Sequence, residues 1–168
     1  MTTNTRRRGA AADLAAFLRD TAGRGNWGHT GLARLLRGVS LEEASWAPGP
    51  AAHSIWEEVN HVIYWSEDVL DRLDGRAVAR RQAWPAGEGG ADGWRRTVAR
   101  AARLHAALVR RVGGLTPAAL ARTAMRTRNR SNTHLILGGA AHVAYHAGRI
   151  ALLRRLYAHA RESGGPAV

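Results

Sequence analysis

The 168-residue sequence contains no cysteine and no lysine, and it has no long run of apolar residues. Without cysteine the chain can form no disulfide, thiolate metal site or cysteine nucleophile, so a metal ligand must be histidine, aspartate or glutamate. No segment approaches the roughly 18 consecutive apolar residues that a membrane span needs. The basic N-terminal segment resembles an export signal, but Asp13, Arg19 and Asp20 interrupt its apolar run. We therefore expect a soluble, cytoplasmic protein that does not cross a membrane.

Acidic residues are missing from residues 93–161, which carry 14 arginines, whereas the whole chain has a formal charge of +12. Six acidic residues instead crowd residues 57–74, where Arg72 is the one basic residue. These charges could pair within the domain or across an interface between two copies, and we expect a homodimer. The sequence has no helix-turn-helix, zinc-finger or RNA-recognition signature, so we do not expect nucleic acid to be the partner.

The alternating pattern of a β-strand is also absent, whereas alanine, leucine and arginine, which favour helices, are abundant. We predict an all-α four-helix bundle with no sheet, as a single domain over residues 1–168, with residues 1–10 disordered and 163–168 a tail. Two long connections, about 80–93 and 113–132, join its later helices. The spacing of apolar residues predicts the four long helices at about 11–21, 54–75, 93–112 and 133–160. In the second of these helices it places one apolar stripe, made of Ile55, Val59, Val62, Val69 and Leu73.

Two histidines, His142 and His146, lie four residues apart in the last predicted helix and therefore on the same side of it. Such a pair can bind a metal, but the same spacing also arises by chance, so it does not decide the matter alone. Because a bundle brings separate helices to one interior point, His61 in the second long helix could complete the site. Three imidazoles suit zinc, nickel, copper or iron and leave coordination positions for water or substrate.

The sequence offers few candidates for a catalytic base. The last helix reads HVAYH and lacks the glutamate that serves as the base in the HExxH motif of zinc proteases. Glu57, one turn before His61, is a candidate catalytic residue, but it follows Ser54 by three residues and so also fits a capping box. Trp65, one turn after His61, could line the pocket, and His134 is the next candidate ligand.

Two segments, HSIWEEVNHVIYWSEDVLDRLDG and HVAYHAGRIALLRR, resemble the DinB/YfiT-like family. The similarity covers about residues 27–156 and includes Trp46 and the neighbouring Trp84 and Pro85. Known relatives include thiol transferases that join bacillithiol or mycothiol to an electrophile, and a mycothiol-dependent isomerase. The resemblance implies a four-helix bundle that binds a divalent metal through His61, His142 and His146.

The family usually has glutamine three residues after the second histidine of the pair, where this chain has Arg149. Arg149 shares a helix face with the histidines, so it could bind an anionic group of the thiol, act in catalysis, or pair with Glu57 or Asp68. We expect a zinc- or nickel-dependent transferase that uses a small thiol, with the thiol or the electrophile as its partner. A metal-dependent hydrolase and a non-catalytic stress-response or polyanion-binding protein remain as alternatives.

Overall fold

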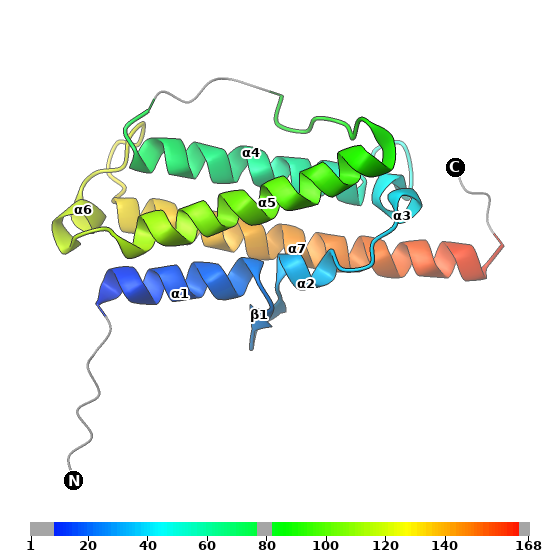
Figure 1. The fold of residues 1–168 in the computed structure, drawn as a ribbon, viewed down its shortest axis with the longest axis horizontal. Helices are drawn as coiled ribbons and strands as arrows, with labels where there is room; N and C mark the ends of the chain where they lie inside the picture. Colours follow the sequence, from blue (N-terminus) through cyan, green and yellow to red (C-terminus); the bar gives the residue numbers. More distant parts are fainter. Residues whose placement is uncertain (1–8, 77–81, 165–168) are drawn as a thin grey trace, which may run out of the picture.

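Four long helices form the bundle in the computed structural model, which describes residues 9–76 and 82–164. Figure 1 shows α1, α4, α5 and α7 running along the long axis of the molecule, with α2 continuing the direction of α1. This arrangement confirms the predicted all-α bundle. In chain order the elements are α1 (Ala10–Ala22), β1 (Gly25–Asn26), β2 (His29–Thr30), α2 (Leu32–Leu35), α3 (Leu41–Ser45), α4 (Ile55–Leu73), α5 (Gly90–Gly113), α6 (Pro117–Ala121) and α7 (Asn132–Glu162).

The ends of the chain lie mostly outside the described residues. Residues 1–8 of the segment predicted to be disordered and residues 165–168 of the predicted tail are among those not described. Within the described part, α1 already begins at Ala10 and α7 ends at Glu162. No helix in these ranges is long and apolar enough to cross a membrane.

Serine side chains fix the start of the two helices that carry the histidines. At the start of α4, the Ser54 hydroxyl accepts a hydrogen bond from the Glu57 amide, and the Glu57 carboxylate accepts one from the Ser54 amide at 2.8 Å. At the start of α7, the Ser131 hydroxyl accepts a hydrogen bond from the His134 amide. These bonds satisfy backbone donors that have no partner within the helix, so they set the register in which each histidine faces the core.

Apolar side chains of the long helices fill the core in two clusters. The apolar stripe predicted on α4 is buried in full: Ile55, Val59, Val62, Val69 and Leu73. One cluster includes Trp56 and Trp94 and the other includes Val112. On α7, His142 lies between Ala140 of the second cluster and Val143 of the first. A layer of polar side chains therefore enters the bundle where the two apolar clusters meet.

Within residues 9–76 and 82–164, a small hairpin departs from the prediction that the chain forms no sheet. Gly25 and Asn26 pair with Thr30 and His29 as two antiparallel strands of two residues each. The Asn26 side chain accepts a hydrogen bond from the Gly28 amide at 2.8 Å and closes the turn. Strands this short are below the length at which alternation can be recognised, so local hydrogen bonding rather than apolar patterning forms the hairpin.

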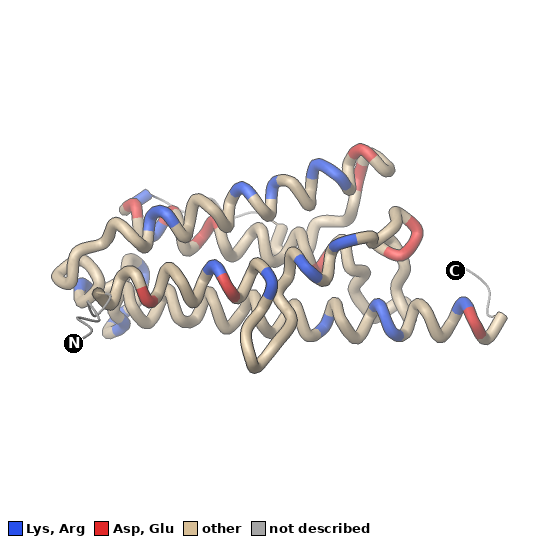
Figure 2. The backbone as a smooth tube through the Cα atoms, turned by 60° about the horizontal axis from the view of Figure 1, so that its bottom comes forward, with Lys and Arg blue, Asp and Glu red and all other residues tan. Residues whose placement is uncertain are grey.

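The acidic and basic helices pair with each other within one molecule. Figure 2 shows basic residues spaced along α5. Arg100 of α5 pairs with Glu67 of α4, and Arg111 of α5 pairs with Asp74, the residue that caps the end of α4, each at 2.5 Å. The uneven distribution of charge along the sequence is therefore explained in part without a second copy, and the homodimer stays a prediction.

We predict that the core depends on Ile136 much more than on its neighbour Leu137. Ile136 is 1% exposed, whereas the side chain of Leu137, turned about 100° around α7, is 43% exposed. Ile136→Ala leaves a cavity and should lower the free energy of unfolding by about 2–5 kcal/mol. Leu137→Ala should change it by about 0.5 kcal/mol or less. Urea unfolding followed by circular dichroism measures both, and equal losses would contradict this description of the core.

Candidate metal centre

The three histidines proposed from the sequence meet at one point between α4 and α7. His61 comes from α4, and His142 and His146 lie one turn apart on α7. One ring nitrogen from each lies within 4.8 Å of the others, so the group could hold a metal ion. His61 and His146 are buried, and His142 is half-buried and leaves the site a side that is open to solvent.

Hydrogen bonds on the far side of two rings fix which nitrogen faces the centre. His61 donates from Nδ1 to the carbonyl oxygen of Ala83 at 2.9 Å, and His146 donates from Nδ1 to Glu58 Oε2 at 2.5 Å. Because each Nδ1 then carries the proton, each Nε2 has a free lone pair. Binding the outer nitrogen to a carbonyl or carboxylate is how metal-binding histidines are commonly held in place.

The distance between the two α7 histidines also fits a shared ion. Nε2 of His142 and Nε2 of His146 lie 3.0 Å apart. Two nitrogens that each bind one metal at about 2.0–2.1 Å lie roughly 2.8–3.4 Å apart when the angle at the metal is about 90–110°. The donor set of three imidazoles thus fits a divalent metal such as zinc or nickel and leaves positions for further ligands.

Burial keeps the ligand nitrogens unprotonated. Burial, and after it the neighbouring His146 and His61, lowers the pKa of His142 to about 4. Burial also lowers the pKa of His61, against the opposing effect of the hydrogen bond to Ala83. Both rings are therefore neutral near pH 7, which is the form in which imidazole binds metals.

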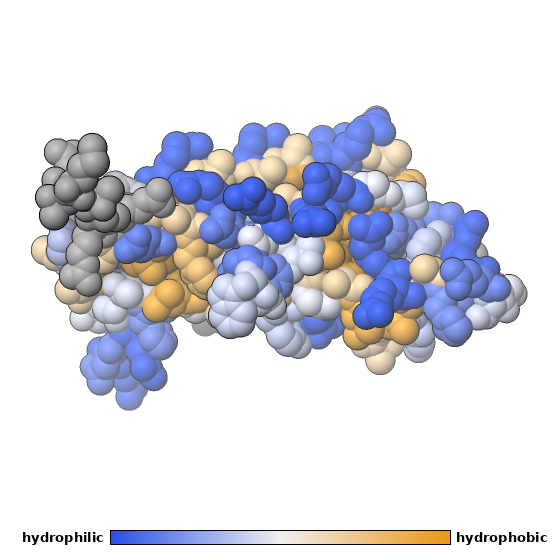
Figure 3. Space-filling model, turned by 90° about the horizontal axis from the view of Figure 1, so that it is seen from below, coloured by the Kyte–Doolittle hydropathy of each residue, from blue (hydrophilic) through white to orange (hydrophobic). Residues whose placement is uncertain are grey.

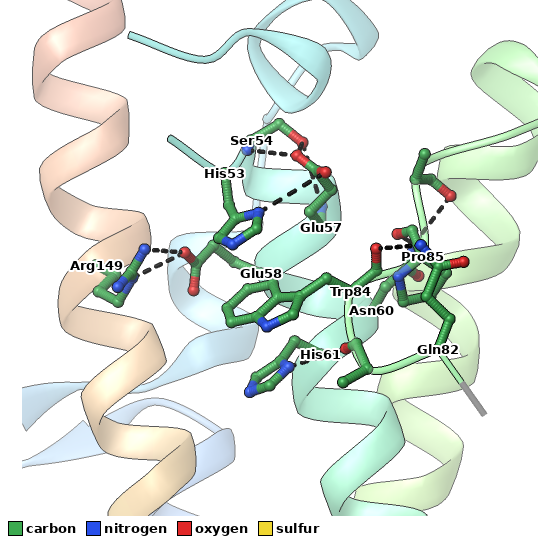
Figure 4. Close-up of polar contacts among 12 residues, drawn as sticks. His53, Ser54, Glu57, Glu58, Asn60, His61, Gln82, Trp84, Pro85 and Arg149 are labelled. Carbon is green, nitrogen blue, oxygen red and sulfur yellow. Dashed lines mark hydrogen bonds and ion pairs between the residues drawn. The ribbon is translucent and has the colours of Figure 1, made fainter. Parts of the chain in front are cut away.

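A buried carboxylate, Glu58, connects the histidine cluster to Arg149. Glu58 is fully buried, and its Oε2 accepts the bond from His146. Its Oε1 accepts from Nε and Nη2 of Arg149, each at 2.8 Å, as Figure 4 shows. The guanidinium of Arg149 compensates the charge of a carboxylate that would otherwise be costly to bury.

Aromatic rings cover the histidines on the side of α4. Figure 4 shows the Trp84 ring between the rings of His53 and His61. Its centroid lies 3.7 Å from that of His61 and 3.8 Å from that of His53, and the three planes are nearly parallel. Trp65 meets His61 and His142 edge-on, as its position one turn after His61 suggested. These rings fix the orientation of His61 and shield one side of the site from water.

The segment that follows the undescribed residues 77–81 contributes to the site. Asn60 of α4 donates to the carbonyl oxygen of Pro85 at 2.9 Å and so holds this segment against the helix. The same segment supplies the Ala83 carbonyl to His61 and the Trp84 ring. The sequence indicated this region through its Trp84 and Pro85 pair, but it gave no role for Ala83.

The two neighbouring glutamates on α4 have different roles in the structure. Both contacts of Glu57 Oε2 are to Ser54, the amide at 2.8 Å and the hydroxyl at 2.9 Å, which is the capping box. Glu58, which the sequence analysis missed, is the carboxylate beside the histidines. The sequence did contain an indication that Glu58 is buried. Glu58 lies one turn from both Ile55 and Val62 and so occupies a core position of the apolar stripe.

The structure also gives the positions and partners of the other polar residues named from the sequence. Arg149 was expected to pair with Glu57, with Asp68 or with a substrate, and its carboxylate partner is Glu58. Asp68 pairs with Arg72 at 2.7 Å within α4. His134 is exposed in the first turn of α7, and the three-histidine group found among the described residues does not include it.

Comparison with known proteins agrees with this arrangement of helices and histidines. The family model of the DinB superfamily matches residues 26–150, which include α4, α5 and all three histidines. No curated protein matches the chain. Since the matched region covers most of the sequence, the chain belongs to the DinB superfamily.

Proposed function

We propose that this protein is a metal-dependent enzyme that activates a low-molecular-weight thiol, of the bacillithiol or mycothiol type, for transfer to an electrophile. The observation that carries the proposal is the convergence of three histidine side chains, two of them fixed through Nδ1 so that Nε2 faces the centre. A bound zinc or nickel ion would supply a Lewis acid that lowers the pKa of a nucleophile.

The residues around the histidines have separate tasks in this proposal. Glu58 orients His146, Ala83 orients His61, and Trp84 and Trp65 keep water from one side of the centre. The half-buried side at His142 admits the substrates. The thiol must come from a second molecule because the chain has no cysteine. The resemblance to thiol transferases favours this reaction over hydrolysis, which the same ligands could also support.

The first prediction concerns the metal content. Protein purified without an affinity tag should contain about one divalent metal ion per chain, because three imidazoles converge. Replacing His61, His142 or His146 by alanine should remove most of it, as measured by elemental analysis. His134→Ala and His159→Ala are matched controls at exposed positions of α7 and should keep the metal. Unchanged metal content in the triple variant of the site would place the metal elsewhere.

The second prediction compares the contributions of Glu57 and Glu58 to metal binding. Glu58→Gln removes the charged acceptor of His146 and should weaken metal binding by about tenfold to a hundredfold. Glu57→Gln retains a side chain that is common in capping boxes, and it should leave the affinity nearly unchanged. Competition with a chelating dye measures both affinities. If Glu57→Gln had the larger effect, the assignment of Glu58 as the residue that orients His146 would be wrong.

The third prediction concerns turnover. Metal-loaded protein should conjugate a chlorobimane with one thiol from a panel of bacillithiol, mycothiol, glutathione and coenzyme A, faster than the uncatalysed reaction. His61→Ala or His146→Ala should abolish this rate, because each removes a ligand. Should no thiol be consumed with zinc or nickel while the metal site is intact, the transferase proposal falls and a hydrolytic or non-catalytic role replaces it.

The role of Arg149 in binding the thiol can be tested in the same assay. All three of its side-chain nitrogens already have partners, two contacts to Glu58 and one from Nη1 to the Tyr145 hydroxyl at 3.3 Å. We therefore expect Arg149→Gln to weaken metal binding while the KM for the thiol changes by about twofold or less. A rise in KM of about tenfold or more would instead show that the arginine binds the carboxylate of the thiol.

A further inference from the structure

An apolar cavity lies on another side of α4, away from the ring nitrogens of the histidines. It has a volume of about 630 Å³, within the range of small-molecule sites. It opens between the α1–α2 segment and α5, and α4 forms its floor with Val62, Ile63 and Ser66. Small residues in both walls leave the space open: Ala22, Gly23, Ala33, Ala101, Ala102 and Ala106.

The lining of the cavity is mainly apolar and therefore favours an apolar ligand over water. Apart from its arginines, its lining is almost wholly aliphatic and includes Leu36, Val98, Leu104 and Val109. Its polar side chains other than the arginines are Ser66 and His105, so it offers few hydrogen-bond partners to water. A space of this size with such walls therefore suits the hydrocarbon part of a ligand.

Three arginines on the rim give the cavity a charge. Arg19 of α1, Arg37 after α2 and Arg110 of α5 line it and are exposed, and no acidic residue lines it. Within the described residues none of these three side chains has an ion-pair partner. Figure 2 shows basic positions on α5 and on the α1–α2 segment, and Figure 3 shows hydrophilic residues beside apolar patches on the face seen from below.

We propose that this cavity binds an amphiphilic anion: an alkyl chain buried against α4 and α5, with its carboxylate at the arginines of the rim. The apolar lining accounts for the chain, and unpaired guanidinium groups at the mouth account for the anionic end. The cavity is separate from the histidine cluster. A smaller cavity of about 20 Å³ lies between them and is lined by Ser66 and His105, which also line the large one, and by Trp65 and His142.

Titration with dodecanoate tests the proposal. Isothermal calorimetry would use the full chain after treatment with a chelator, so that the carboxylate has no metal to bind, and concentrations below the onset of micelles. We expect saturable binding of one dodecanoate per chain, and binding of the uncharged dodecanol that is at least about tenfold weaker. No saturable binding of dodecanoate, or equal affinity for the two, would overturn the proposal.

Matched arginine variants identify the site. The triple variant R19Q/R37Q/R110Q should weaken dodecanoate binding at least tenfold and leave dodecanol binding unchanged. The control R122Q/R128Q/R155Q removes the same charge from exposed arginines outside the cavity lining and should change the affinity by about twofold or less. If both triple variants weakened dodecanoate binding equally, the loss of net charge alone would explain the effect, and the proposal would be overturned.

An independent variant tests the cavity itself. Ala102→Phe adds bulk at an exposed position of the lining and should weaken dodecanoate and dodecanol alike. Unchanged binding of both ligands would overturn the proposal. The proposal would also fail if the protein were a dimer and the substitutions R19Q/R37Q/R110Q made it dissociate, since the cavity would then lie in an interface between two copies. The assay uses metal-free protein, so failure of the metal-dependent reaction does not affect its outcome.

Discussion

The contact of the Glu58 carboxylate with α7 is the interaction on which the centre of this molecule depends. One oxygen of this fully buried carboxylate on α4 accepts a hydrogen bond from His146. The other oxygen accepts one from the guanidinium of Arg149. Burying such a charge is unfavourable unless its partners satisfy both oxygens, and removing either partner leaves it uncompensated. The pair of helices can therefore pack in one register, and that register is the one that brings His61 to the two histidines of α7.

The rest of the bundle supports this polar layer. Capping by Ser54 and Ser131 fixes where α4 and α7 begin, and the two apolar clusters hold the helices together on either side. The Trp84 ring packs on His61, and the Ala83 carbonyl determines which nitrogen of that ring is protonated. The geometry of the histidines thus follows from contacts with the chain's own side chains and backbone, which is how metal-binding histidines are commonly oriented.

Apolar periodicity and the spacing of histidines were enough to predict the long helices, the α4 stripe and the three candidate ligands, because these follow from local pattern and from the geometry of a helix. The partner of His146 was not predictable in the same way. Glu57 and Glu58 differ by one position, and a 100° rotation about the helix decides which of them caps the helix and which enters the core. The contribution of Ala83 could not be found from its type, since it acts through its backbone carbonyl. The apolar cavity likewise depends on alanines in α1, α2 and α5 that face one another only in the folded chain.

In the proposed metal centre the three Nε2 atoms share one ion, while Glu58 stays outside the coordination sphere. Anomalous diffraction from crystals grown with zinc, recorded on both sides of the absorption edge, tests it most directly. We expect one strong peak about 2.0–2.1 Å from Nε2 of His61, His142 and His146, with Glu58 still bonded to Nδ1 of His146. A peak bound by Glu58 in place of a histidine, or no peak between α4 and α7, would contradict it.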